Sequence, residues 1–381
     1  MHLLKQLIKY LILSIVNLLV KKKSTVQPKT ILLIRLDAIG DYVLFRNFIE
    51  ILKNQYPDYK ITLVGNIAWK TIAEEFDTKF IHNFIWINRN KFEKNPIYRY
   101  KTLQKITNQG YEIVINPTFS RTFFSDDSIV KTVSAKEKIG SVGDLSNIKI
   151  WQKNISDKYY TKLISAKQNI MFEFDRNREF IENLFDKKIN IQKPHLELED
   201  INLQIELPQK YAVLFIGASA KFRKWNIANF VEIGKFLKEN YNYDILVCGG
   251  PTDLDEVTKF KELAKYNYLD LVGKTSLIEL LDIIYNGNLM VTNETSAPHF
   301  AVSLEMTNIF VVSNGNHFGR FTPYPKEILQ GYYPIYHPEI EIDLDDYKKL
   351  SHSYGFGSQL NINEISIKQV KEKIGGIIGQ S

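Results

Sequence analysis

The sequence predicts an α/β protein with two domains, each built around a doubly wound parallel sheet. Short apolar runs rich in β-branched residues alternate with segments of helical periodicity after residue 30, and the same alternation begins again after residue 210. A chain of 381 residues is long enough for two domains of roughly 100–200 residues each. No fixed-period repeat or low-complexity tract interrupts the pattern.

Composition excludes several protein classes. Hydrophobic residues make up 44% of the chain and charged residues 24%, which are ordinary globular values and exclude wholesale disorder or a polytopic membrane protein. Cys248 is the single cysteine, so an internal disulfide is impossible, and no Cys/His cluster has zinc spacing. The net charge of +6 favours anionic surfaces or phosphorylated ligands, but the basic residues are dispersed, which argues against nucleic-acid binding.

The first residues predict an amphipathic helix. Only eleven residues separate Lys9 from Lys21, too few to span a bilayer, and no small-residue cleavage site follows. We expect residues 1–23 to lie in the membrane interface with their lysines against anionic lipid; packing on the protein's own surface and a marginal transmembrane anchor are the alternatives. The apolar half contains Leu4, Leu7, Ile8, Leu11, Ile12, Ile15, Leu18 and Leu19, and the polar half contains His2, Lys5, Gln6, Lys9, Tyr10, Ser14 and Asn17, interrupted by Leu3, Leu13, Val16 and Val20.

The remaining elements follow in order. In the first half we expect strands at 31–36, 60–66, 80–87 and 112–117, with helices at 41–54, 67–76, 97–109 and 166–184. In the second half we expect strands at 211–219, 244–250, 268–273, 289–293 and 307–314, with helices at 227–239, 253–265, 277–285, 297–304 and, capped by Asn363, at 363–374. The predicted organisation is therefore a helix and basic linker (1–27), an N-terminal domain (28–185), a connection (186–208), a C-terminal domain (209–338) and a tail (339–381).

Ligands of open parallel sheets bind at the carboxyl ends of strands, so the loops after the apolar runs are the candidate sites. In the loop 35–41, Gly40 lets a ligand approach the backbone, and Asp41 begins a helix, where a capping role is the plain interpretation. Neither the dinucleotide G-x-G-x-x-G motif nor a Walker motif is present. This absence argues against a nicotinamide dehydrogenase and a P-loop NTPase.

Three loops of the second half suit a phosphorylated ligand in a cleft between the domains. The loop 217–225 combines the small residues Gly217 and Ser219 with cations, which suits a pyrophosphate unless the cations are simply solvated. In the turn 249–253, Asp253 is placed to bind a ribose diol or to cap the turn. The loop 292–299 has hydroxyls and a histidine, His299, that suit phosphate oxygens, although a structural histidine is the alternative.

With these loops identified, the sequence resembles glycosyltransferase family 9, the bacterial ADP-heptose:lipopolysaccharide heptosyltransferases. The resemblance extends over residues 29–330 and rests on the segments ILLIRLDAIGDYVL, GASAKFRKW, GGPTD, LVGKTSLIELLDII and TNETSAPHFAVSL. It implies the GT-B fold, with two facing Rossmann-like domains and an interdomain cleft. The nucleotide sugar then binds mainly to the C-terminal domain and the acceptor to the N-terminal side.

The resemblance also implies roles for single residues. Asp41 corresponds to the general base, with Arg35 and Gly40 beside it on the acceptor side. Glu294 replaces the family's usual Asp, and Ser296 replaces its usual Gly, which leaves the donor sugar open. The implied donor-binding residues are Gly217, Ser219, Arg223, Lys224, Asp253, Thr275, Glu294, Thr295, Ser296 and His299.

The expected activity is an inverting, metal-independent glycosyl transfer, since no Asp-x-Asp motif occurs in these loops. The donor is a nucleotide-diphosphate sugar used as co-substrate, with ADP-heptose one candidate, and no other cofactor is expected. The acceptor is a glycolipid or oligosaccharide, such as the lipopolysaccharide core or another cell-envelope glycan. We expect a cytoplasmic protein, peripheral on the inner face of the membrane. A GT-B epimerase or phosphorylase, and a degenerate transferase acting as a binding scaffold, are the alternatives.

Overall fold

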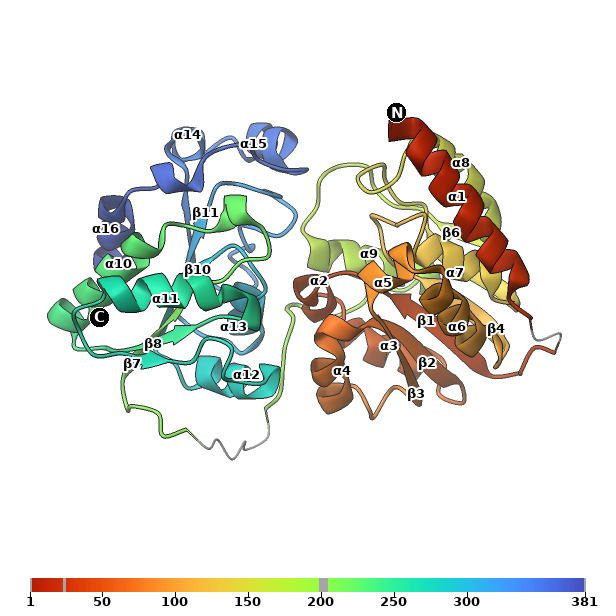
Figure 1. Ribbon diagram of the computed structural model, residues 1–381, viewed down its shortest axis with the longest axis horizontal. Coiled ribbons are helices and arrows are strands. Elements are labelled where there is room, and N and C mark those ends of the chain that lie inside the picture. The colour runs from red at the N-terminus through yellow and green to blue at the C-terminus, as the bar shows by residue number, and fades with distance from the viewer. Residues whose placement is uncertain (1, 23–24, 199–204, 380–381) are drawn as a thin grey trace. The chain divides into compact units, whose positions relative to one another are not determined.

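The computed structural model describes residues 2–22, 25–198 and 205–379, with side chains described from residue 8 onward. The chain divides into two compact units (Figure 1). The N-terminal unit comprises Met1–Asn169 and Phe174–Ile191, and the C-terminal unit comprises Ile170–Glu173 and Gln192–Ser381. Part of the predicted connection, residues 199–204, lies outside the described residues, as do the side chains of residues 2–7 in the predicted N-terminal helix.

The N-terminal unit contains a six-stranded sheet in which every pair of neighbouring strands is parallel. The strand order β3-β2-β1-β4-β5-β6 is that of a doubly wound sheet, and the winding reverses between β1 and β4. The carboxyl ends of these two central strands therefore form the ligand-binding position that this topology favours. The strands are β1 (Thr30–Arg35), β2 (Lys60–Asn66), β3 (Asn83–Ile87), β4 (Tyr111–Asn116), β5 (Ala135–Ser141) and β6 (Lys162–Ile164).

Helices pack on this sheet and bury its apolar residues. The buried cluster draws side chains from β1, β2, β3 and β4 and from the helices α6 and α7. The first helix, α1, packs against α6 and α7 (Figure 1). The helices of this unit are α1 (His2–Leu19), α2 (Ile39–Val43), α3 (Asn47–Gln55), α4 (Lys70–Phe76), α5 (Arg89–Lys94), α6 (Pro96–Thr107), α7 (Asp126–Thr132), α8 (Ile150–Ser156) and α9 (Glu173–Phe185).

The C-terminal unit repeats the same architecture. Its parallel sheet has the order β12-β11-β10-β7-β8-β9, which is the order of the first sheet when its strands are numbered from β7. The winding reverses between β7 and β10. The strands are β7 (Tyr211–Phe215), β8 (Asp244–Cys248), β9 (Leu269–Asp270), β10 (Leu289–Asn293), β11 (Ile309–Ser313) and β12 (Tyr332–Tyr336).

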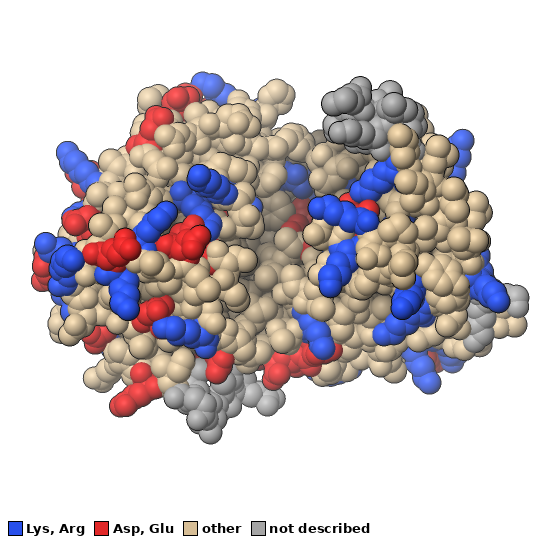
Figure 2. Space-filling view, viewed as in Figure 1, with Lys and Arg blue, Asp and Glu red and all other residues tan. Residues whose placement is uncertain are grey.

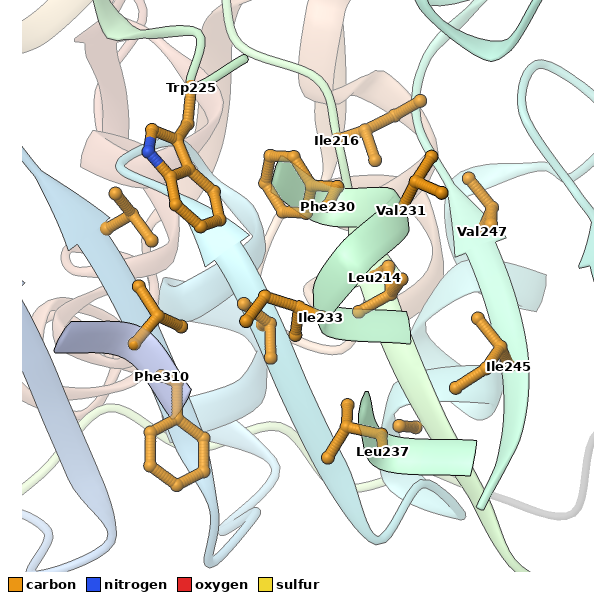
Figure 3. Close-up of a cluster of buried hydrophobic side chains, with 14 of the residues drawn as sticks. Leu214, Ile216, Trp225, Phe230, Val231, Ile233, Leu237, Ile245, Val247 and Phe310 are labelled. Carbon is orange, nitrogen blue, oxygen red and sulfur yellow. The ribbon is translucent and has the colours of Figure 1, made fainter. Parts of the chain in front are cut away.

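The core of the C-terminal unit lies between the sheet and α10. Phe230, Ile233 and Leu237 project from α10 onto apolar side chains of the strands, including Leu214 and Phe310 (Figure 3). The last helix also packs on α10, and its side chains Val370 and Ile374 join the same core. The helices are α10 (Ile227–Tyr241), α11 (Leu254–Leu263), α12 (Leu277–Tyr285), α13 (Ala297–Ser303), α14 (Pro338–Glu341), α15 (Tyr347–Tyr354) and α16 (Ile367–Ile378).

Three predicted helices differ from the structure. The helix expected at 41–54 is two helices, α2 and α3, and the helix expected from residue 166 begins only at Glu173. The last helix begins at Ile367 because Ser366 and Gln369 form a capping box. The predicted cap, Asn363, instead accepts a hydrogen bond from the backbone N–H of Asn226 at 2.8 Å.

Candidate functional site

The loop after β1 lies at the reversal point of the N-terminal sheet, with Arg35 at its start and Asp41 at its end. Asp41 is the third residue of α2 and is half-buried. The N-cap of this helix is Ala38, so the interpretation of Asp41 as a helix cap is wrong. Gly40 is the second residue of α2 and adopts helical conformation.

Arg35 supports this loop from inside the protein. Its side chain is 0% exposed, and its Nε lies 2.8 Å from Oδ2 of Asp37. The guanidinium also donates to Oδ1 of Asn177 at 3.3 Å and to the carbonyl oxygen of Asp41 at 3.4 Å. The ring of Phe45 covers its face at 4.4 Å. Because Arg35 is buried, these contacts position the loop, and its assignment to the acceptor side stays a prediction.

The same loop and α2 are fixed by side chains that the sequence did not single out. The indole of Trp69 and the amide of Asn66 both donate to the carbonyl oxygen of Asp37, at 3.2 and 3.0 Å. Tyr42, next to Asp41, stacks on Trp69 with 3.8 Å between ring centroids and donates to Oδ2 of Asp77 at 2.5 Å. Burial raises the pKa of Asp77 despite these hydrogen bonds and its ion pair with a nearby arginine.

In the C-terminal unit, Asn293 joins the two loops at the reversal point. Its Oδ1 accepts from the backbone N–H of Trp225 at 2.9 Å, and its Nδ2 donates to the carbonyl oxygen of Ile216 at 2.9 Å. The side chain is fully buried at the end of β10. One amide thus ties the loop after β7 to the loop after β10.

Asp253 lies beneath these loops. It is 4% exposed, and its two oxygens accept from Nζ of Lys224 at 2.8 Å and from the backbone N–H of Gly250 at 3.0 Å. A Cβ at position 217 would lie 2.1 Å from Oδ2 of Asp253, so only glycine fits there. The carboxylate holds the turn, as the alternative interpretation has it, and the binding of a ribose by Asp253 stays a prediction.

Lys224 is similarly engaged. Its ammonium lies 2.8 Å from both Asp253 and Glu256. Burial alone would lower the pKa of Lys224, but the hydrogen bonds to the two carboxylates outweigh it and raise the pKa. Two carboxylates offset its charge, so the structure does not place Lys224 as the cation that meets a diphosphate.

Arg223 differs from its neighbour. It ends a short 3₁₀ helix, is half-buried, and donates to Oγ of Ser219 at 2.6 Å. None of the ion pairs formed by the described residues includes Arg223. Of the two adjacent cations, Arg223 is therefore the one whose charge is available to an anion.

Glu294 follows β10 directly and is buried. Ser313 donates to its Oε2 at 2.5 Å. Burial raises the pKa of Glu294 to about 7, although the hydrogen bond from Ser313 and the charge of Arg223 oppose the shift. The carboxyl group is therefore poised between its charged and neutral forms near neutral pH.

The next two residues, Thr295 and Ser296, directly precede α13, with Ser296 at its N-cap. Thr295 and Ser296 are half-buried, and Ser296 has φ −73° and ψ −25°, a helical conformation open to any residue. Serine in place of the family's usual glycine is thus accommodated without backbone strain.

His299 lies on α13 below the loop. Its Nδ1 is 2.6 Å from the hydroxyl of Tyr324, and burial lowers the pKa of His299 to about 4. The side chain is therefore uncharged at neutral pH and packs among aromatic rings, including Phe321. In this structure His299 fits the structural alternative, and its donation to phosphate oxygens stays a prediction.

Thr275 lies on a third loop, between β9 and α12, and is half-buried. Gly273, two residues earlier, has φ +67°, and its N–H donates to the carbonyl oxygen of Gly249 at 3.0 Å. This bond ties the loop of Thr275 to the Gly-Gly turn that Asp253 holds.

The sequence reading missed the loop after β11. Asn316 forms a side-chain hydrogen bond with Glu294, and His317 has the unusual φ of +59°. Burial, and then the charge of Arg320, lower the pKa of His317 to about 4. The sequence held a signal for this loop, because Asn314, Gly315 and Asn316 directly follow the buried strand β11. Among the residues described here, no group of three His, Cys, Asp or Glu side chains is arranged to hold a metal ion.

Comparisons with known proteins agree with this architecture. The chain is 23% identical over 309 residues to lipopolysaccharide heptosyltransferase 3 of Escherichia coli K12, covering 76% of this chain and 84% of the relative. A family 9 glycosyltransferase structure from Veillonella parvula superposes with a TM-score of 0.69 at 18% identity, covering 93% of this chain and 99% of the other.

A second solved structure, E. coli heptosyltransferase WaaC with ADP-2-deoxy-2-fluoro heptose, gives a TM-score of 0.66 at 15% identity, covering 91% of this chain and 99% of the other. These likenesses confirm the predicted GT-B architecture of two Rossmann-like domains. The model of glycosyltransferase family 9 (heptosyltransferase) matches residues 99–332, more than half of the sequence. The chain therefore belongs to glycosyltransferase family 9 and is a glycosyltransferase.

Proposed function

We propose that this protein transfers a heptose or a related sugar from a nucleotide-diphosphate donor to the lipopolysaccharide core or another cell-surface glycan. The names of the relatives support this class of donor and acceptor. The observation on which the proposal chiefly depends is the position of Asp41, a half-buried carboxylate at the reversal point of a doubly wound sheet that does not serve as the helix cap.

In the proposed reaction, Asp41 accepts the proton of the acceptor hydroxyl as its oxygen attacks the anomeric carbon of the donor sugar. The bond between that carbon and the diphosphate oxygen breaks, and the configuration at the carbon inverts. Such proton transfer requires a carboxylate fixed within hydrogen-bonding reach of the hydroxyl. The contacts of Arg35, Trp69 and Tyr42 supply that rigidity.

The nucleoside diphosphate leaves with increased negative charge. In this proposal Arg223 stabilises that charge, together with the hydroxyls of Thr295 and Ser296 and the N–H groups of their loop, without a metal ion. Lys224 and Asp253 hold the loop rather than the ligand. Fixed donors of this kind stabilise a leaving group without reorganising during the reaction.

The test is a product assay with ADP-heptose, with and without a lipopolysaccharide-core acceptor lacking heptose. We expect ADP release and a heptosylated acceptor only when both substrates are present. Conversion of the donor sugar without acceptor would instead identify an epimerase. Calorimetry that detects no binding of ADP or other nucleoside diphosphates would identify a scaffold protein and refute the transferase proposal.

A further inference from the structure

The N-terminal helix α1 turns its polar side toward the protein. Asn17, 8% exposed, donates to Oγ of Ser128 at 3.2 Å and accepts from Nε of Arg99 at 3.0 Å. Lys9 pairs with Glu93 at 3.1 Å. These contacts fix the rotation of the helix about its own axis.

Apolar side chains complete the inner face. Leu13, Val16 and Val20 are only 4–8% exposed, and Tyr10 packs edge-on against Trp151 with 6.0 Å between ring centroids. Leu13, Val16 and Val20 are residues that interrupted the polar half in the sequence, and the structure explains them, because they pack against the protein. The sequence alternative in which the helix packs on the protein's own surface is thus correct for this face.

The opposite face of α1 is apolar and exposed. At 100° per residue its six side chains fall within an arc of about 120°, which makes one continuous stripe along the helix. Their exposed fractions are 47–81%, far above those of the inner face. Monomeric proteins rarely present so continuous an apolar surface unless it meets a membrane or a partner. The stripe consists of Ile8, Leu11, Ile12, Ile15, Leu18 and Leu19.

The surroundings of this stripe are basic. Lys21 and Lys22 are exposed directly after the helix, and no Asp or Glu occurs in the first 36 residues. Burial, and then the positive charge of Lys22, lower the pKa of Lys138 to about 8. On the face shown in Figure 2, the charged side chains around α1 and α6 are mostly Lys and Arg. A second copy of the chain would bring like charges together, whereas an anionic bilayer would neutralise them.

We propose that the stripe on α1 binds an anionic lipid bilayer, with the helix lying parallel to the membrane plane at the boundary between headgroups and acyl chains. The apolar side chains enter the acyl region, and Lys21 and Lys22 contact the headgroups. Within the described part of the chain, none of the helices has the length and apolar composition needed to cross a bilayer. The inference does not depend on the proposed sugar transfer.

The test is sedimentation of the full-length protein with vesicles of phosphatidylcholine, alone or mixed with phosphatidylglycerol. The variant Leu11→Gln/Ile15→Gln/Leu18→Gln changes only side chains exposed in the structure. We expect its partition coefficient for mixed vesicles to fall by at least about tenfold, because apolar insertion supplies most of the affinity. The matched control is Ile342→Gln/Leu344→Gln/Phe356→Gln, which removes exposed apolar side chains from the C-terminal unit and should leave binding unchanged.

The charges are tested separately. Lys21→Gln/Lys22→Gln should lose affinity only for vesicles that contain phosphatidylglycerol, and added salt should reduce the difference from the unaltered protein. The proposal would be overturned if the Leu11 triple variant and the unaltered protein bound vesicles equally well. Thermal unfolding curves would first establish that both proteins are folded. The proposal would also be overturned if the unaltered protein were a dimer without lipid and the triple variant a monomer, since the stripe would then be a protein interface.

Discussion

The buried guanidinium of Arg35 donates a hydrogen bond to the carbonyl oxygen of Asp41 over 3.4 Å. The proposed base is therefore fixed through its main chain by a residue that a substrate cannot reach. Asp41 is the proposed base, and Arg35, six positions earlier, holds its main chain. The two residues can therefore be substituted one at a time to separate catalysis from stability.

Replacing Asp41 by asparagine should lower kcat by about a hundredfold or more, because positioned general bases contribute roughly 10²–10⁴ to rate. The Kd for the nucleoside diphosphate should stay within about twofold, since the proposed donor contacts lie in the C-terminal unit. Steady-state kinetics and calorimetry measure the two effects. Asp58→Asn, the same chemical change at an exposed carboxylate, is the control. A turnover of Asp41→Asn near that of the control would remove Asp41 from catalysis.

Replacing Arg35 by methionine should act mainly on stability. The change leaves the carboxylate of Asp37, which is only 14% exposed, without its cation, and breaking a buried pair costs about 3–5 kcal/mol. Denaturant unfolding measures the loss. Adding Asp37→Asn to the same protein should recover at least about 1 kcal/mol of the free energy of unfolding, because the carboxylate charge that Arg35 balanced is gone. If the single change costs less than about 1 kcal/mol, the ion pair does not hold the loop.

Arg223→Met and Lys224→Met should have different effects although the residues are adjacent. We expect Arg223→Met to weaken ADP binding at least about tenfold, in line with about 1.5–3 kcal/mol for a hydrogen bond to a charged group. Lys224→Met should instead lower the free energy of unfolding, because Asp253 is 4% exposed and would lose its partner. Calorimetry with ADP and denaturant unfolding of both variants separate ligand binding from stability. If Lys224→Met weakened ADP binding and Arg223→Met lowered the free energy of unfolding, the two assignments would have to be exchanged.

Glu294→Gln tests the burial of this carboxyl group through pH. Its pKa of about 7 in the folded protein lies above the ordinary glutamate value of 4.5, so the folded state binds the proton more tightly than the unfolded chain. The contribution to stability is present below about pH 4.5 and is lost as the pH rises through about 7. Between about pH 4.5 and 7, the free energy of unfolding of the unaltered protein should fall by up to about 3 kcal/mol relative to that of Glu294→Gln. If the free energies of unfolding of the two proteins changed with pH in parallel, burial would not raise the pKa of Glu294.

Most of the architecture could be predicted because it depends on local pattern. Buried parallel strands are short apolar runs, as in ILLIR from Ile31 to Arg35, and the switch-point rule identifies the loops after them as the candidate sites. The division of one helix into α2 and α3 was not visible, because the apolar periodicity continues through the break.

The roles of single residues were less predictable because they depend on partners far away in sequence. Lys224 and Asp253 are 29 positions apart, and Arg35 and Asn177 are 142 apart. A lysine in a loop of small and basic residues gives no local sign that a distant carboxylate already binds it. Likewise, nothing beside His299 in the sequence indicates the hydroxyl of Tyr324, which occupies its Nδ1.

The repeated strand order has a consequence for how this scaffold can be altered. The segment that follows the first central strand carries an acid, Asp41, in one unit and a cation, Arg223, in the other, although the two sheets have the same strand order. The chemical difference between the two units thus lies in the segments after these strands and not in the sheets themselves. A connection grafted after β7 would have to keep Gly217 and Lys224, which pack on and pair with Asp253, as well as the contact with Asn293.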